Sequence, residues 1–195
     1  DLPDDEHVVA LLEEARGLGV NLLDTAPAYG SSEDRIGQLL PGSRDQWVIV
    51  SKAGERFEAG QSHFDFSPGA IRASVEQSLR RLRTDYLDAV LLHSDGRGEE
   101  GDRFLPAIEA PGDMKHEGKL RATGFSGKTL AGGLKMVNCI DLAMVTYNPG
   151  QREELPVIEA PARLGKGILV KKALASGHAV NPGQALAGAG QEDAE

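Results

Sequence analysis

The stretch NLLDTAPAYG, residues 21–30, decides the fold of this chain. It is a short apolar run that ends in the carboxylate of Asp24, and a glycine-containing loop then carries Tyr29. An apolar run that closes on a titratable side chain is the pattern of a buried strand whose carboxyl end faces a site.

Two later segments repeat this pattern. WVIVSKAG (47–54) ends its apolar run at Lys52, and YLDAVLLHSD (86–95) ends its run at His93. In a barrel of parallel strands and helices, the carboxyl ends of all strands face one shared site. The sequence therefore predicts that a carboxylate, a phenol, an ammonium and an imidazole converge.

Strand and helix patterns alternate along the whole chain. Six apolar strands are expected at 20–25, 47–52, 86–93, 119–125, 140–147 and 167–172. Helical patterns lie at 4–18, from Ser31 to about Leu40, after the Ser67–Pro68 cap, and around 104–117, 128–138 and 154–164. This alternation predicts an α/β fold of parallel βαβ units with right-handed crossovers, and so a TIM barrel.

Three segments carry more local expectations. Residues 54–66 are polar with interspersed Gly and Phe, and we expect a loop there. Pro111 and Pro161 fall inside helical patterns, where we expect kinks or early ends. Residues 178–195 are small, polar and rich in Gly and Ala, which predicts a tail or a frayed helix.

Composition excludes several classes of partner. The net charge of −9 argues against nucleic acid and anionic membranes, and no apolar run approaches the roughly 20 residues that span a bilayer. Cys139 is the single cysteine, which fits a reducing cytoplasm, and the acidic start DLPDDEHVV does not resemble a signal peptide. His63-x-Asp65 and His93-x-Asp95 lack further ligands at zinc-like spacing, so we expect no metal.

The four convergent side chains suit the reduction of a carbonyl group. An unperturbed tyrosine, with a pKa of about 10, is a poor acid at pH 7, and a Lys ammonium beside a phenol stabilises the phenolate. At about 4 Å and an effective dielectric constant near 20, that attraction is worth roughly 4 kcal/mol before screening. A carboxylate can hold the ammonium in place, and an imidazole can orient the carbonyl.

Four motifs, in this order, resemble the aldo-keto reductase family. They are NLLDTAPAYGSSEDRIGQLL (21–40), VIVSKAG, LDAVLLHS and GKLRATGFSG (118–127). The resemblance runs from about Asp4 to about Gly177, and it implies a partial aldo-keto reductase barrel domain over residues 1–177. It also implies reduction of aldehydes or ketones to alcohols, or the reverse oxidation, with NADPH; NADH stays open.

The resemblance assigns roles to individual residues. Tyr29 becomes the general acid, Lys52 and Asp24 tune it, and His93 binds and orients a small carbonyl substrate. The residues expected to contact the cofactor are Asp24, Ser126, Met144, Lys171 and Leu174. Three positions depart from the family: Gly127 stands where many members have Asn, Met144 where many have Gln, and Lys171 where many have an aromatic that stacks on the nicotinamide.

Several alternatives stay open. A closed barrel has eight strands, so the family's first strand is expected before Asp1 and its last after about Gly177. The chain could be a cofactor-binding regulatory or partner-binding barrel with little turnover. It could also be an isomerase or aldolase that uses Lys52 as a Schiff-base amine. The natural substrate and the oligomeric state have no readable signal.

Overall fold

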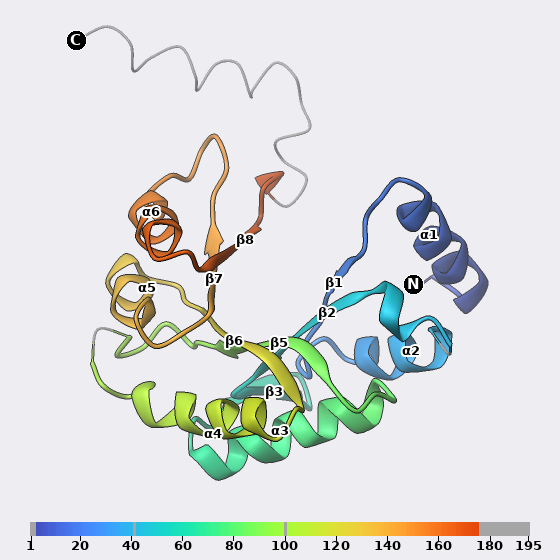
Figure 1. Cartoon of the computed structure of the whole chain (residues 1–195), viewed down its shortest axis with the longest axis horizontal. Coiled ribbons are helices and arrows are strands. Elements are labelled where there is room, and N and C mark those ends of the chain that lie inside the picture. The colour runs from blue at the N-terminus through green and yellow to red at the C-terminus, as the bar shows by residue number, and fades with distance from the viewer. Residues whose placement is uncertain (1–2, 41, 100, 176–195) are drawn as a thin grey trace, which may run out of the picture.

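The computed structural model describes residues 3–40, 42–99 and 101–175, and the expected tail at 178–195 lies outside them. A parallel sheet of six strands, in the order β1-β2-β5-β6-β7-β8, curls into a half-barrel (Figure 1). Its strands are β1 (Leu22–Asp24), β2 (Val48–Ala53), β5 (Leu87–His93), β6 (Leu120–Ser126), β7 (Leu142–Thr146) and β8 (Gly167–Lys171).

Six helices cover the convex side of this sheet in Figure 1. They are α1 (Asp5–Gly17), α2 (Ser32–Leu39), α3 (Pro68–Arg81), α4 (Leu105–His116), α5 (Leu130–Met136) and α6 (Leu155–Arg163), and a short 3-10 turn, η1 (Arg44–Gln46), precedes β2. The α/β class and the partial barrel are therefore confirmed. Ser67 caps α3 as expected, because its side chain accepts a hydrogen bond from the backbone N–H of Ala70.

Two apolar clusters hold the half-barrel together. The larger lies between the sheet and the helices and includes Ile49, Ile71, Leu92, Phe104 and Phe125. The smaller lies on the other face of the strands; its buried members are Val50, Ala89, Leu91 and Met144. Because neighbours along a strand alternate between the two faces, both faces must be apolar, which explains the nearly continuous apolar runs.

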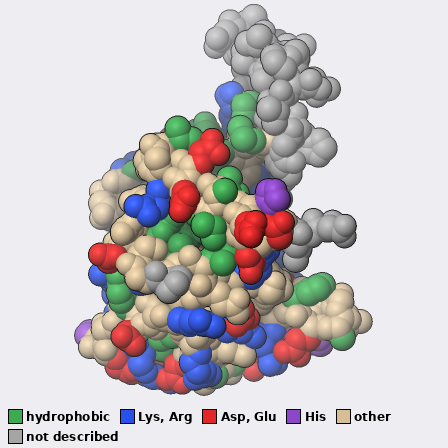
Figure 2. Space-filling model, turned by 90° about the vertical axis from the view of Figure 1, so that its right-hand side faces the viewer, with side chains coloured by type: hydrophobic (Ala, Val, Ile, Leu, Met, Phe, Trp, Pro, Cys, Tyr) green, Lys and Arg blue, Asp and Glu red, His purple; other side chains and the backbone are tan. Residues whose placement is uncertain are grey.

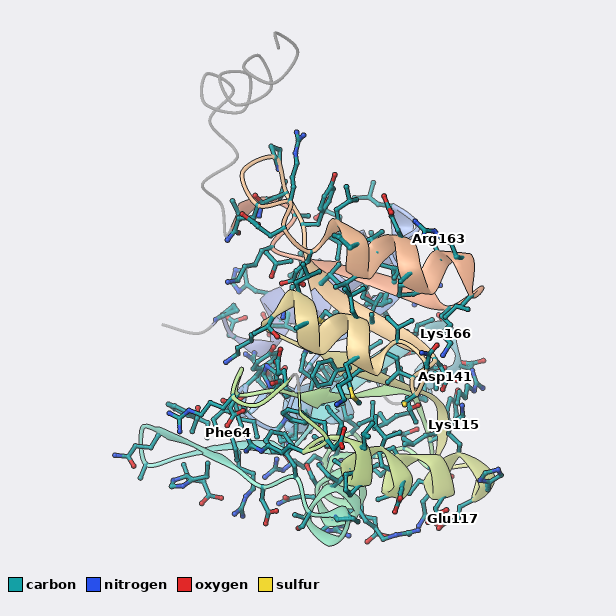
Figure 3. All side chains as sticks on the ribbon, turned by 90° about the vertical axis from the view of Figure 1, so that its left-hand side faces the viewer. Phe64, Lys115, Glu117, Asp141, Arg163 and Lys166 are labelled. Atoms are coloured by element: carbon teal, nitrogen blue, oxygen red, sulfur yellow. The ribbon has the colours of Figure 1, made fainter. Side chains whose placement is uncertain are left out.

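Strand register brings the carboxyl ends together. Lys52 on β2 pairs with Leu91 on β5, and His93, two residues further along, pairs with Ser126 at the end of β6. Asp141, which directly precedes β7, holds the other end of this strand in place. Its Oδ2 accepts hydrogen bonds from Lys115 Nζ at 2.5 Å and from the backbone N–H of Thr123 at 2.7 Å. Figure 3 shows Lys115 and Asp141 side by side, far from Phe64.

The loop expected at 54–66 is instead a β-hairpin. Strand β3 (Glu55–Glu58) pairs with β4 (Gln61–Phe64) in antiparallel register. The turn between them is Ala59–Gly60, with φ angles of 50° and 79°. Two consecutive residues with positive φ give the turn whose twist matches a hairpin. Most side chains of the hairpin are exposed, so the sequence lacks the alternation that marks a half-buried strand.

The two internal prolines do not end their helices at once. Helix α4 continues past Pro111 to His116, and α6 continues past Pro161 to Arg163. A proline inside a helix costs one hydrogen bond and some steric strain, about 3 kcal/mol. Both prolines are buried, and in α4 the buried Ala107 and Met114 flank Pro111, so core packing offsets that cost.

Helix α1 packs less than its pattern predicts. None of its residues is buried, although Leu12 and Ala15 touch the main core. Leu11 stays exposed, and Figure 2, which faces this side of the molecule, shows hydrophobic side chains at the surface among acidic ones. In the part of the chain that the structure describes, no helix is both long and apolar enough to span a membrane.

Candidate functional site

Lys52 lies at the centre of the predicted site. Its side chain is 2% exposed, and Nζ donates hydrogen bonds to Asp24 Oδ1 at 2.7 Å and to the backbone carbonyl of Thr25 at 3.0 Å. A buried ammonium requires such partners, because isolation from water is very costly for a charge. These two bonds fix the position of the ammonium at the end of β2.

Tyr29 and His93 both lie beside this ammonium. Lys52 Nζ is 4.7 Å from the centroid of the Tyr29 ring, which is cation–π distance. The rings of Tyr29 and His93 meet edge to face, with centroids 6.4 Å apart and planes at 89°. Tyr29 is 46% exposed, so its ring stays open to an incoming molecule. The structure therefore brings together all four residues predicted from the strand ends.

His93 is held as a neutral imidazole. Burial, followed by the charges of Lys52, Lys171 and Lys128, lowers its pKa to about 4, although Glu55 acts in the opposite sense. Oε2 of Glu55 lies 2.7 Å from Nδ1 of His93, but its approach falls outside hydrogen-bond geometry. Glu55 therefore acts on the ring through its charge, and no hydrogen bond from it fixes the tautomer.

A cleft of about 590 Å³ opens over these side chains. Tyr29 and His93 line one part of it, and the rest includes Gly127 and the ammonium groups of Lys128, Lys171 and Lys172. Lys171, the last residue of β8, donates hydrogen bonds to Ser126 Oγ at 3.1 Å and to the carbonyl of Gly127 at 3.0 Å. Glu153 and Glu154 also line the cleft, so its three lysines face two carboxylates, and the lining is slightly positive within a chain of net charge −9.

The expected cofactor residues lie at different places. Lys171 lines the cleft, whereas Ser126 is 1% exposed and its hydroxyl is engaged by Lys171. Met144 belongs to the smaller apolar cluster and is not among the residues that line the cleft. Leu174, in the turn after β8, is 63% exposed. Of the residues expected to contact the cofactor, Lys171 is therefore the one whose side chain faces the cleft directly.

Sequence reasoning missed two residues near the site. Glu55 begins the hairpin directly after Gly54 and reaches His93, and Lys128 follows the turn after β6. The signal available for Glu55 was its position just past the end of β2, the same kind of position that singled out Tyr29 beyond β1. The hairpin was not expected, so nothing in the sequence directed Glu55 toward His93.

The described residues contain no group of three or more His, Cys, Asp or Glu side chains that could hold a metal ion. Both possible ligand pairs have other partners. Asp65 Oδ1 accepts a hydrogen bond from the backbone N–H of Ser67, and Asp95 Oδ1 accepts one from Arg97 N and another from Arg103 Nη1.

Comparison with known proteins agrees with this geometry. Residues 2–193 match the model of the Aldo/keto reductase family. A relative from Bacillus subtilis, named "Uncharacterized oxidoreductase YqkF", is 32% identical over 182 residues, which are 85% of this chain. The match spans 58% of that relative, so this chain covers under two thirds of its length.

Solved structures give the same result. A "putative aldo-keto reductase" from Pseudomonas aeruginosa is 53% identical and superposes with a TM-score of 0.83, covering 90% of this chain and 70% of that one. An aldo/keto reductase from Klebsiella pneumoniae, solved in complex with NADP and acetate, is 26% identical with a TM-score of 0.69, covering 92% and 62%.

Proposed function

We propose, since this chain belongs to the aldo/keto reductase family, that the protein reduces aldehydes or ketones with NADPH, or runs the reverse oxidation. The observation that carries the proposal is the convergence of Tyr29, Lys52, Asp24 and His93, of which Tyr29 and His93 line one cleft. The protein's full activity, its substrates and its cytoplasmic location all belong to this proposal.

The donor set of the cleft fits a nicotinamide dinucleotide. Its volume, about 590 Å³, lies in the range of small-molecule sites. Lys128, Lys171 and Lys172 supply positive charge toward a ligand that carries phosphates, and they outnumber the two carboxylates in the same lining, Glu153 and Glu154. When bound, the cofactor supplies a hydride. NADPH is our preference, because the Klebsiella pneumoniae neighbour was solved with NADP.

The side chains of this chain would handle the proton and the carbonyl. Tyr29 would donate its phenolic proton to the substrate oxygen, since its ring is exposed to the cleft. The ammonium of Lys52 would stabilise the phenolate that remains, and Asp24 would keep that ammonium in place. His93, neutral at pH 7, would orient the carbonyl as an uncharged hydrogen-bonding group.

The contacts of Lys52 weigh against a Schiff-base enzyme. A nucleophilic lysine must reach its substrate, whereas the side chain of Lys52 is 2% exposed and its Nζ is held by Asp24 and by the carbonyl of Thr25. Trapping with borohydride would detect an adduct on Lys52 if one formed. A regulatory barrel with little turnover differs from the enzyme in its rate alone, so kinetics distinguish the two.

The direct test uses the purified protein. Fluorescence titrations with NADPH and NADH establish whether a cofactor binds and which one is preferred. A panel of small aldehydes then measures turnover by loss of cofactor absorbance. Cofactor binding without turnover on any aldehyde or ketone would favour the regulatory alternative, and the absence of binding would refute the proposal.

A further inference from the structure

Lys171 is fixed in the cleft by two hydrogen bonds from its ammonium group. One goes to the hydroxyl of Ser126 at the end of β6, and the other to the carbonyl of Gly127 in the turn that follows. An ammonium has three N–H donors, so a third remains after these two bonds. A flexible lysine gains a defined position in this way, beside the end of β6 and facing the cleft.

The charge of Lys171 interacts with other ionisable groups around the cleft. Burial lowers the pKa of its ammonium, and the nearby charges of Lys172, Lys128 and Lys52 lower that pKa further, whereas Glu154 opposes them. The charge on Lys171 in turn helps to lower the pKa of His93. A positive charge at Lys171 therefore acts on groups at the reaction centre, and it would act on any charged ligand bound there.

We propose that Lys171 makes the cleft discriminate between the two oxidation states of the nicotinamide cofactor, binding the reduced form more tightly than the oxidised form. This inference rests on the proposed function. The oxidised nicotinamide ring carries a positive charge, and the reduced ring is neutral. The ammonium group of Lys171 beside the ring therefore repels the oxidised cofactor and leaves the affinity for the reduced cofactor unchanged.

The placement of the charge relative to the ring follows from the proposed reaction. A hydride donor must lie beside the carbonyl that Tyr29 and His93 would bind, and Lys171 lines the same cleft as these two residues. The ammonium would thus lie within one or two molecular contacts of the ring. An aromatic side chain at this position would attract a cationic ring, so the lysine reverses the sign of the interaction.

The expected size follows from Coulomb repulsion between two positive charges in a partly solvated cleft. For two unit charges roughly 6 Å apart, with an effective dielectric constant near 20 and salt screening, the ratio of dissociation constants changes by about tenfold or more. The effect falls on the oxidised cofactor alone. The protein would consequently favour reduction of carbonyls over oxidation of alcohols when both cofactor forms are present.

The experiment measures binding and needs no turnover. Dissociation constants for NADPH and NADP⁺ are measured by calorimetry on the full-length wild type and on Lys171→Met, Lys171→Gln and Lys171→Arg. Lys172→Met is the matched control, because it removes the adjacent ammonium from the same cleft, where that residue is exposed. Lys171→Gln keeps a side-chain donor for Ser126 and removes only the charge.

We expect both neutral variants at Lys171 to bind NADP⁺ about tenfold more tightly relative to NADPH than the wild type does. Lys171→Arg should keep the wild-type ratio, and Lys172→Met should change it less than about threefold, because exposed charges are screened. An unchanged ratio in a folded Lys171→Gln that binds NADPH would overturn the inference. An equal change in Lys172→Met would also overturn it, since the effect would then belong to the cleft as a whole. A wild type that binds neither form overturns the proposed function as well.

Discussion

At the residue scale, catalytic turnover should depend most clearly on the hydroxyl of Tyr29. Its ring lies 4.7 Å from Lys52 Nζ and faces the cleft, so loss of its hydroxyl removes the proton donor and little else. We expect Tyr29→Phe to lower turnover by roughly 10²–10⁴, the usual worth of a positioned general acid. Steady-state kinetics on a reactive aldehyde measure this. Turnover close to that of the wild type would remove Tyr29 from the mechanism.

Lys52 offers a different test, because it is buried and also structural. We expect Lys52→Met to impair catalysis more than folding. The methionine fills most of the space of the lysine, and Asp24, which loses its donor, is 36% exposed and can be solvated. The paired substitution Asp24→Asn with Lys52→Met removes both charges and serves as the control for the unpaired carboxylate. Melting temperatures and specific activities are compared. A large loss of melting temperature with unchanged activity would assign Lys52 to the fold alone.

His93 should make stability depend on pH. Its pKa is about 4 in the folded protein, mainly through burial, against about 6.5 in an unfolded chain. The unfolded state therefore binds more protons between these values, and the free energy of unfolding rises with pH across that window. The contribution is complete above about pH 6.5, amounts to at most about 3 kcal/mol, and is lost as the pH falls toward 4.

Denaturant titrations at pH 5 and pH 7.5 test this dependence. The difference in stability between wild type and His93→Asn should grow with pH. His63→Asn is the control, because His63 is exposed on the hairpin. A pH dependence that is identical in wild type and His93→Asn would show that the imidazole of His93 titrates normally.

At the element scale, Gly37 determines how closely α2 approaches α3. A Cβ atom there would lie 2.1 Å from the carbonyl oxygen of Arg81 and 2.8 Å from Cα of Leu82, and backbone atoms cannot simply move aside. We expect Gly37→Ala to lower the free energy of unfolding by about 1–3 kcal/mol. In Gly69→Ala, at the start of α3, the new methyl group meets nothing within 4 Å, so stability should stay level or rise by up to about 1 kcal/mol. Equal changes in the free energy of unfolding for Gly37→Ala and Gly69→Ala would contradict a close approach of α2 to the end of α3.

The helices and strands also show which parts of the fold could be predicted from the sequence. The central strands of the sheet were predictable because both of their faces are buried, which leaves apolar runs such as residues 89–92 of β5. The hairpin was not, because its side chains are mostly exposed and its turn is Ala-Gly, a weaker signal than Asn-Gly. The continuation of α4 past Pro111 depends on tertiary packing, which local propensity does not contain.

The candidate site likewise contains residues that the sequence could predict and contacts that it could not. Asp24, Lys52 and His93 were visible because each ends an apolar strand, and parallel strands bring such ends together. Contacts that cross from one strand end to another through long side chains were not visible. The bond from Lys171 to Ser126 and the approach of Glu55 to His93 are of this kind, since they depend on side-chain conformations. The roles of these residues stay predictions.

At the scale of the whole molecule, the sheet has two edges. In the described residues, β1 and β8 each have a neighbouring strand on one side only. Apolar side chains are open there, including Leu22 on β1 and Val170 on β8, and a hollow of about 180 Å³ on the inner face is lined mainly by apolar residues. Unpaired backbone groups beside apolar surface favour association with other chains.

We therefore expect a polypeptide of only these 195 residues to self-associate through its edges. Light scattering after gel filtration, over a series of dilutions, should show a mass that rises with concentration. Val170→Lys places a charge on the edge strand, where Val170 is 47% exposed, and should reduce this association. Leu164→Lys adds the same charge at a similarly exposed position, the C-cap of α6 outside the edge strand. It should reduce association less, because the unpaired backbone groups lie on the edge strand itself. A polypeptide that stays monomeric at every dilution, or two variants with the same effect, would show that the edges are not the surface through which the chains associate.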